Sequence, residues 1–126
     1  MKKSTPENRQ DDRILRQCAE QFDGLRRELV ALDYFCKGTV LSRMMKCGKI
    51  NCACRSDPSA RHGPYYELTY KRAGKTINIP LTQDQADMFR AGTREWRRLK
   101  KILQRMEGTS RRALNRKARF VKLLQE

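Results

Sequence analysis

The feature that most constrains this chain is a cluster of thiol and imidazole side chains in a polar segment. Three cysteines and the only histidine fall between positions 47 and 62, in the spacing C-x4-C-x-C-x7-H. The segment is too polar to build an apolar core, so a crosslink must fix its path. Thiolates and imidazole nitrogens are the donors that Zn²⁺ binds tetrahedrally in structural sites. We therefore predict one structural zinc ion held by Cys47, Cys52, Cys54 and His62.

Other interpretations of the cluster fit less well. A redox pair would have the spacing C-x-x-C, which is absent, and a catalytic cysteine–histidine pair would need only one thiol. Chance grouping is a poor explanation with five cysteines in the chain. Four protein ligands would also fill the tetrahedral shell, which argues against zinc catalysis. In extended backbone, Cys52 and Cys54 would point to the same side. Cys18 and Cys36 are expected to be buried apolar residues, with Cys36 as the alternative ligand.

Heptad spacing predicts a long helix on each side of the cluster. The first helix is expected over 11–36, with Gly38 near its C-cap. The second begins at 82, where Thr82 and Gln85 form a capping box. The expected apolar positions are Leu15, Cys18, Phe22, Leu25, Leu29, Leu32 and Cys36 in the first helix, and Phe89, Gly92, Trp96, Leu99, Leu103 and Met106 in the second.

A glycine and two poor helix formers at 107–110 predict a break in the second helix. The apolar spacing resumes in register beyond it, through Ser110, Ala113, Lys117, Phe120 and Leu124, so one long kinked helix is the alternative. The two helices could pair within one chain or between two chains of a homodimer, or each could pack on the sheet, and the sequence leaves all three arrangements open.

The middle of the chain predicts a small antiparallel sheet of about three strands. Residues 39–47 form the first strand, and 64–70 and 75–81 form a hairpin with Gly74 in its turn. The fold class is therefore α+β, a zinc-clasped sheet flanked by long helices. The expected parts are a flexible N-terminus (1–10), an amphipathic helix (11–36), the zinc-clasped β domain (37–81) and a basic helical region (82–126).

The charge of the chain is large and unevenly placed. The formal net charge is +15, and residues 1–36 contribute none of it, because their seven basic and seven acidic residues cancel. Residues 37–126 carry the whole excess. A concentrated positive charge predicts a polyanionic partner, most simply DNA or RNA. The alternative is a solvated basic surface that only keeps the protein dispersed.

The sequence also bears on location. The N-terminal lysines are followed by polar residues, so no secretory signal is expected. No run reaches the roughly 20 apolar residues of a membrane span. We therefore expect a cytoplasmic protein, associated with the nucleoid if it binds DNA, in a reducing compartment where clustered cysteines bind metals.

Two groups of basic residues are candidates for contacts with nucleic acid. The first surrounds the predicted metal loop and hairpin, together with a tyrosine that could stack on a base. It comprises Arg43, Lys46, Lys49, Arg55, Arg61, Tyr66, Lys71, Arg72 and Lys75. The second lies along the C-terminal helical region, where acids are scarce. It comprises Arg94, Arg97, Arg98, Lys100, Lys101, Arg105, Arg111, Arg112, Arg116 and Arg119. By strand alternation, only one of Tyr65 and Tyr66 is expected to face outward, and Trp96 is expected to be core.

These motifs resemble an uncharacterised family of small bacterial and archaeal proteins. The matching residues form the pattern C-G-K-x-N-C-x-C, then H-G-P-Y-Y, then a G-K-T hairpin and a basic helix, over about half of the chain. Members of that family are often encoded near transposases. The resemblance implies zinc binding and a nucleic-acid setting, and it names no substrate.

The sequence therefore predicts a zinc-stabilised nucleic-acid-binding protein, with DNA favoured over RNA, as an accessory to a transposase or recombinase. The alternative is an adaptor whose heptad helices bind a partner protein without nucleic acid. We expect no enzymatic activity, because the sequence has no paired carboxylates, phosphate-binding loop or nucleophile triad. The alternative, a metal-dependent nuclease, would need carboxylate ligands or an open coordination position, and neither is evident.

Overall fold

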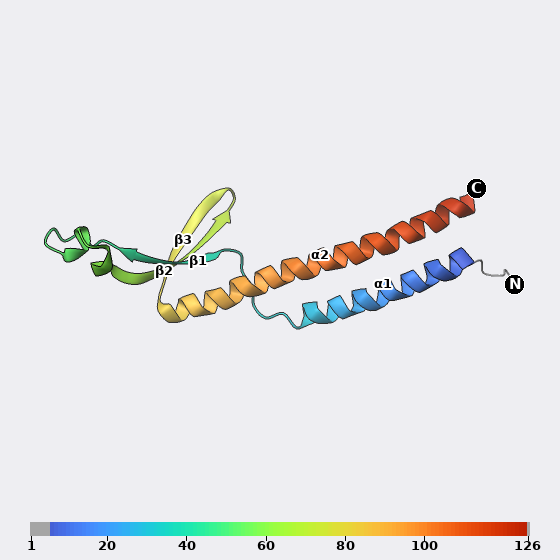
Figure 1. Cartoon of the computed structure of the whole chain (residues 1–126), viewed down its shortest axis with the longest axis horizontal. Helices are drawn as coiled ribbons and strands as arrows, with labels where there is room; N and C mark the ends of the chain where they lie inside the picture. The colour runs from blue at the N-terminus through green and yellow to red at the C-terminus, as the bar shows by residue number, and fades with distance from the viewer. Residues whose placement is uncertain (1–5, 126) are drawn as a thin grey trace. The chain divides into compact units, whose positions relative to one another are not determined.

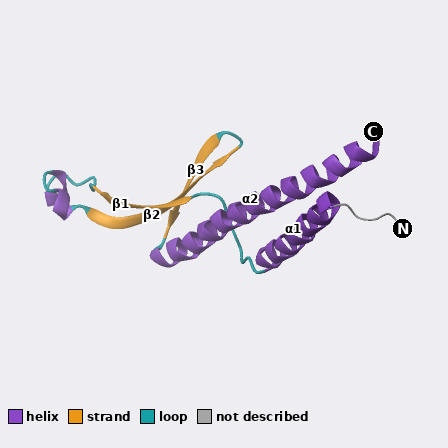
Figure 2. Cartoon of the chain, turned by 45° about the vertical axis from the view of Figure 1, so that its right-hand side comes forward, coloured by secondary structure: helices purple, strands orange, loops and turns teal. Residues whose placement is uncertain are grey.

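The computed structural model describes residues 6–125, and the side chains of residues 6–119. The elements follow in the order α1 (Pro6–Val30), β1 (Thr39–Met45), two short 3-10 turns η1 (Ala53–Arg55) and η2 (Pro58–Ala60), β2 (His62–Arg72), β3 (Lys75–Leu81) and α2 (Gln83–Gln125). Two long helices thus flank a three-stranded antiparallel sheet, and the expected α+β class is confirmed (Figures 1 and 2).

The chain divides into two compact units that do not follow the linear boundaries expected from the sequence. The sheet unit runs from Asp33 to Arg97 and includes the first part of α2. The helical unit comprises the chain up to Leu32 and from Arg98 onward. The basic C-terminal region predicted as one part is therefore shared between the two units.

The sheet has the order β1-β2-β3, with β2 in the centre. Its bounds are Thr39–Met45 for β1, His62–Arg72 for β2 and Lys75–Leu81 for β3. Leu68 is buried in the middle of β2, opposite Val40 on one side and Ile79 on the other. Cross-strand contacts of this kind are the main stabilising unit of a small sheet.

The β2–β3 hairpin closes as the sequence predicts. Arg72 pairs with Lys75, so the turn consists of Ala73 and Gly74. Both have positive φ, 50° and 78° respectively. Two consecutive positive φ values characterise the hairpin turns whose twist matches that of the strands. Glycine at position 74 adopts this backbone without the strain that a side chain would add.

Helix α2 (Gln83–Gln125) begins at the predicted capping box. The Gln85 amide donates to the hydroxyl of Thr82 at 3.2 Å, and the Thr82 amide donates to the side-chain oxygen of Gln85 at 3.0 Å. Two amides at the helix start, which have no partner within the helix, are thereby satisfied.

The predicted break at 107–110 is wrong, because α2 continues unbroken through Gly108. A glycine within a helix costs only about 1 kcal/mol relative to alanine. An ion pair from Arg111 to Glu107, one turn apart at 2.7 Å, spans the glycine. Thr109 is half-buried rather than a new cap.

Helix α1 spans Pro6–Val30, not 11–36. Proline at the first helical position loses no hydrogen bond, which explains a start before Asp11. Residues 6–10 are therefore helical rather than flexible, and residues 1–5 lie outside the described part of the chain. The expected cap at Gly38 is also wrong, since that glycine leads into β1.

The segment after α1 departs from the helix because it joins the sheet unit. The backbone amide of Cys36 donates to the carbonyl of Gly92 in α2 at 3.2 Å. A side chain at position 92 would come within 3.2 Å of the Cys36 sulfur, so glycine permits this close approach. Nearby, the rings of Phe35 and Trp96 lie 5.7 Å apart, which places the half-buried Trp96 in a small aromatic contact.

In the helical unit, α1 and the part of α2 from Arg98 onward run side by side in opposite directions (Figures 1 and 2). Ile14, Cys18 and Leu25 of α1 are buried, as is Ile102 of α2. Leu103 is 49% exposed, so the predicted apolar row is displaced by one residue there. Because residues 102 and 103 are both apolar, the sequence is compatible with an apolar row through either position.

Candidate metal centre and basic surfaces

The four predicted ligands come together at the end of the β1–β2 strands. Cys47 follows β1, Cys54 lies within η1 (Ala53–Arg55), Cys52 is the N-cap of that turn, and His62 is the first residue of β2. One donor atom from each residue lies within 4.8 Å of all the others. The cluster thus consists of three thiol sulfurs and one imidazole nitrogen from segments up to fifteen residues apart.

The separations within the cluster are compatible with one metal ion. The sulfurs of Cys47 and Cys54 are 3.5 Å apart, and the Cys52 sulfur is 3.2 Å from Nε2 of His62. Two thiolates on a tetrahedral ion with metal–sulfur bonds of about 2.3 Å would lie about 3.8 Å apart. Only small shifts therefore separate this arrangement from a tetrahedral shell.

The environment of Cys54 favours the thiolate form. Its side chain is completely buried, and its sulfur accepts a hydrogen bond from the Cys47 backbone amide at 3.3 Å. That amide hydrogen bond is the main cause that lowers the pKa of Cys54 to about 7. A thiolate is the form that binds metals.

The loop between Cys54 and His62 is shaped by a local hydrogen-bonded turn. Asp57 caps η2 (Pro58–Ala60) by accepting from the Ser59 amide at 3.0 Å and from the Ser59 hydroxyl at 2.7 Å. The two Ser59 hydrogen bonds also lower the pKa of Asp57. The residues D-P-S carry this turn signal, which the spacing of the ligands alone does not show.

Gly63 lets β2 begin close to β1 immediately after the histidine. Its φ is +135°, and a Cβ atom there would lie 2.7 Å from the carbonyl oxygen of Arg43. The following Gly63–Pro64 peptide bond is cis. A glycine at 63 is therefore required for His62 to face the cysteines at this register.

One prediction about the geometry of the cluster is wrong, because Cys52 and Cys54 approach each other through a 3-10 turn rather than through extended backbone.

The other two cysteines, Cys18 and Cys36, are not part of the cluster. Cys36 packs against Gly92, and burial raises the pKa of its thiol. Cys18 is buried in the helical unit. The expectation that both are packing residues agrees with these positions.

Several of the predicted nucleic-acid contacts are engaged with carboxylates. Arg43 pairs with Glu67 at 3.4 Å across the sheet. In the helical unit, Arg116 is half-buried and pairs with the buried Asp11 at 2.7 Å, which gives it a structural partner. Further pairs join Arg105 to Glu28 and Arg111 to Glu107. The side chain of Arg61 is half-buried beside the metal cluster.

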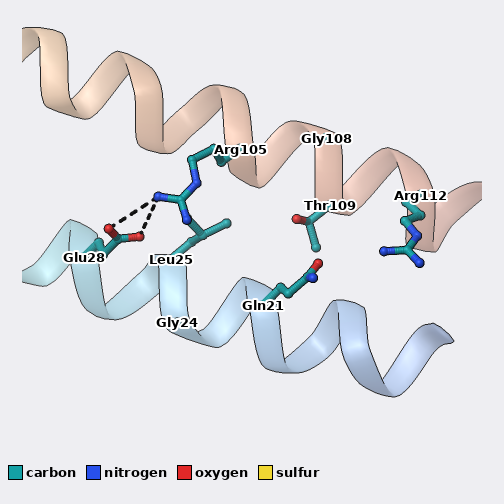
Figure 3. Close-up of a pocket in the computed structure, with 8 residues that line it drawn as sticks. All are labelled: Gln21, Gly24, Leu25, Glu28, Arg105, Gly108, Thr109 and Arg112. Carbon is teal, nitrogen blue, oxygen red and sulfur yellow. Dashed lines mark hydrogen bonds and ion pairs between the residues drawn. The ribbon is translucent and has the colours of Figure 1, made fainter. Parts of the chain in front are cut away.

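Figure 3 shows the surroundings of Arg105 in the helical unit. Arg105 reaches from α2 to Glu28 of α1, while Gly24 and Gly108 leave a hollow of about 660 Å³ between the helices. Arg112 lines the same hollow. The hollow is open, and the opposite charges of Arg105 and Glu28 neutralise each other. The hollow therefore has no concentrated charge of one sign.

The remaining predicted basic residues are exposed. Those of the metal loop and hairpin are Lys46, Lys49, Arg55, Lys71, Arg72 and Lys75. Those of α2 are Arg94, Arg97, Arg98, Lys100, Lys101, Arg112 and Arg119.

The tyrosines at the start of β2 divide as strand alternation predicts. Tyr65 is 52% exposed, whereas Tyr66 is half-buried. The guanidinium of Arg90 in α2 lies over the Tyr66 ring, 5.2 Å from its centre. Tyr66 was among the contact residues predicted from the sequence and Arg90 was not, because the contact between α2 and β2 has no local sequence signal.

Among the described residues, no helix is long and apolar enough to cross a membrane. Comparison with known protein families identifies a match. The family model of a domain of unknown function, DUF6788, covers residues 8–91, which include all four residues of the metal cluster. No curated protein and no solved structure matches the chain.

Proposed function

The chain belongs to the family of the domain of unknown function DUF6788, and we propose that it is a nucleic-acid-binding protein whose fold is held by one structural zinc ion. Zinc suits the donor set, because three thiolates and one imidazole are typical of closed tetrahedral zinc sites. All four positions would be filled by Cys47, Cys52, Cys54 and His62. The ion would then order the loop and leave binding to the surface around it.

The observation that carries the nucleic-acid proposal is the charge distribution. The excess of +15 is confined to residues 37–126, and thirteen of the predicted basic contacts are exposed. Exposed lysines and arginines of this density are suited to phosphate groups, which they contact without reading the base sequence. The exposed Tyr65 is available to stack on an unpaired base.

We take duplex DNA as the favoured partner and a role beside a transposase or recombinase as the setting. This part of the proposal depends on the resemblance of the cysteine, histidine and hairpin motifs to proteins encoded near transposases. Such an accessory would hold phosphate backbone without performing the strand chemistry, and the proposed protein is accordingly not an enzyme.

Fluorescence anisotropy with a labelled 20-base-pair DNA duplex, and with an RNA duplex of the same sequence, tests the proposal. The zinc-loaded protein is expected to bind at low salt and to lose affinity steeply between about 50 and about 200 mM salt. Tighter binding to DNA would support the favoured partner. Absence of binding to both duplexes at the lowest salt would contradict the nucleic-acid proposal.

A second candidate function is supported by exposed apolar side chains in the helical unit. Leu114 is 61% exposed at a hollow of about 610 Å³ whose lining includes Leu15, Phe22 and Ala113. Such a surface is suited to a partner helix, from a second copy or from another protein. Sedimentation velocity of the isolated protein distinguishes the two candidates: self-association without any affinity for nucleic acid would favour the adaptor.

A further inference from the structure

Three arginines of α2 and the start of β1 enclose a small hollow in the sheet unit. Arg90, Arg94 and Arg97 are spaced four and three residues apart, which places them on one face of the helix. They line a cavity of about 230 Å³ together with Thr39, Val40 and Thr93. Three guanidinium groups around one hollow create a local excess of positive charge.

One of the three arginines has a carboxylate partner among the described residues. Arg90 forms an ion pair with Asp87 at 3.4 Å, longer than the 2.7–2.9 Å typical of a strong charged hydrogen bond. Arg94 and Arg97 are exposed, and neither forms an ion pair or hydrogen bond among the described residues. Two guanidinium groups are thus available to an incoming anion.

The position of Arg90 is fixed by the sheet. Its guanidinium lies over the ring of Tyr66, 5.2 Å from the ring centre, and a cation above an aromatic face is held by the charge distribution of the ring. Thr93 is buried, and its hydroxyl donates to the Arg90 carbonyl at 3.0 Å. The hydroxyl-bearing Thr39 on β1 completes a polar lining.

We propose that this arginine pocket, lined by Arg90, Arg94 and Arg97, binds a phosphate group of the nucleic-acid backbone. Guanidinium groups donate pairs of parallel hydrogen bonds that match two phosphate oxygens, and an arginine contacts phosphate better than a lysine for that reason. Tyr66 then acts as a positioning residue for Arg90 rather than as a base-stacking residue. This inference rests on the proposed function and names the site of one of its phosphate contacts.

The test compares two double variants with equal loss of charge. In the pocket variant, Arg94→Gln/Arg97→Gln removes the two free guanidinium groups. In the control variant, Arg13→Gln/Arg16→Gln removes two exposed arginines of α1. The variant Arg94→Lys/Arg97→Lys keeps the charge but loses the paired geometry. Circular dichroism melting of the zinc-loaded proteins verifies that all three variants are folded.

For the 20-base-pair DNA duplex, the pocket variant is expected to lose at least tenfold in affinity. The slope of log affinity against log salt should also fall by about 0.9, since the loss of one phosphate contact removes about that much. The control variant should stay within twofold to threefold of the wild type. The lysine variant should bind with intermediate affinity and an almost unchanged slope.

The outcomes separate this inference from the proposed function. If the wild type binds the duplex and the pocket and control variants lose affinity equally, the pocket assignment is wrong while nucleic-acid binding stands. If the wild type does not bind the duplex, the proposed function fails first. Vesicles of phosphatidylserine and phosphatidylcholine serve as a second probe: pocket-dependent binding to vesicles alone would assign the pocket to lipid phosphates and overturn the inference.

Discussion

At the residue scale, the surroundings of Cys54 in the Cys/His cluster differ from those of Cys36. Cys54 is fully buried, which by itself disfavours a thiolate, but its sulfur accepts the Cys47 amide, and that hydrogen bond is the main cause of its lowered pKa. Cys36 lies against Gly92 with a raised pKa, as expected of a neutral thiol. The same residue type thus has opposite electrostatic environments within one unit.

This contrast predicts different effects of two serine variants. Cys54→Ser is expected to reduce bound zinc to well below one equivalent, because a hydroxyl is a far weaker ligand than a thiolate. Cys36→Ser should retain one equivalent. Atomic emission analysis of dialysed protein measures the zinc content. Equal zinc content in both variants would show that Cys54 is not a ligand.

A second residue-scale prediction concerns Gly63, where an added Cβ would lie 2.7 Å from the Arg43 carbonyl oxygen at a φ of +135°. Gly63→Ala is expected to lower the free energy of unfolding by about 1–3 kcal/mol or more. Gly48→Ala is the control, because nothing lies within 4 Å of a Cβ atom added there. Urea denaturation of the zinc-loaded proteins compares the two, and equal stability would contradict the tight contact between β1 and β2.

At the element scale, local signals in the sequence predicted more than long-range ones could. The capping box at Thr82 and the turn at Gly74 were predictable because each depends on two to four neighbouring residues. The end of α1 was not, since the chain leaves the helix to bond Gly92, more than fifty residues away. Arg90 was overlooked for the same reason, as its partner Tyr66 lies on another element.

The reciprocal hydrogen bonds of the capping box predict a measurable contribution to α2. Thr82→Ala is expected to cost about 1 kcal/mol, because the Gln85 amide would lose its partner at the helix start. Gln83→Ala, an exposed first-turn position, is the control and should change stability by less than about 0.5 kcal/mol. Thermal and urea denaturation measure both. Indistinguishable stabilities would show that the cap does not form.

The continuous course of α2 predicts different effects of alanine at two of its glycines. Gly108→Ala should stabilise the helix by about 0.5–1 kcal/mol, since nothing lies within 4 Å of the added atom. Gly92→Ala should gain less or be destabilising, because the added atom would come within 3.2 Å of the Cys36 sulfur. If residues 107–110 formed a turn instead, Gly108→Ala would be destabilising in the same urea titrations.

At the scale of the whole molecule, few of the described residues are buried, so a bound metal ion should contribute strongly to order. Of the described residues, those buried in the sheet unit include Cys54 and Leu68, and the cysteine belongs to the metal cluster. Free energies of structural zinc binding reach about 10 kcal/mol or more in small domains. The Cys/His cluster was predictable from its spacing, whereas the arginine pocket required the fold.

Removal of the metal should therefore disorder the loop selectively. After treatment with EDTA, peptides covering residues 46–66 are expected to exchange their amide hydrogens much faster, because the loop has little other support. Peptides of α1 should change little, and added zinc should restore the protection. Hydrogen exchange with mass spectrometry measures both regions, and unchanged exchange across 46–66 would mean that the loop is ordered without metal.

The most direct test of a closed structural metal site is X-ray absorption at the zinc edge of the wild-type protein loaded with one equivalent of zinc. Three sulfur neighbours at about 2.3 Å and one nitrogen neighbour at about 2.0 Å are predicted, with no water oxygen in the shell. That result would leave the exposed basic residues and the arginine pocket as the functional surface. A shell with an oxygen neighbour, or with fewer than three sulfurs, would contradict a closed site and direct attention back to the metal.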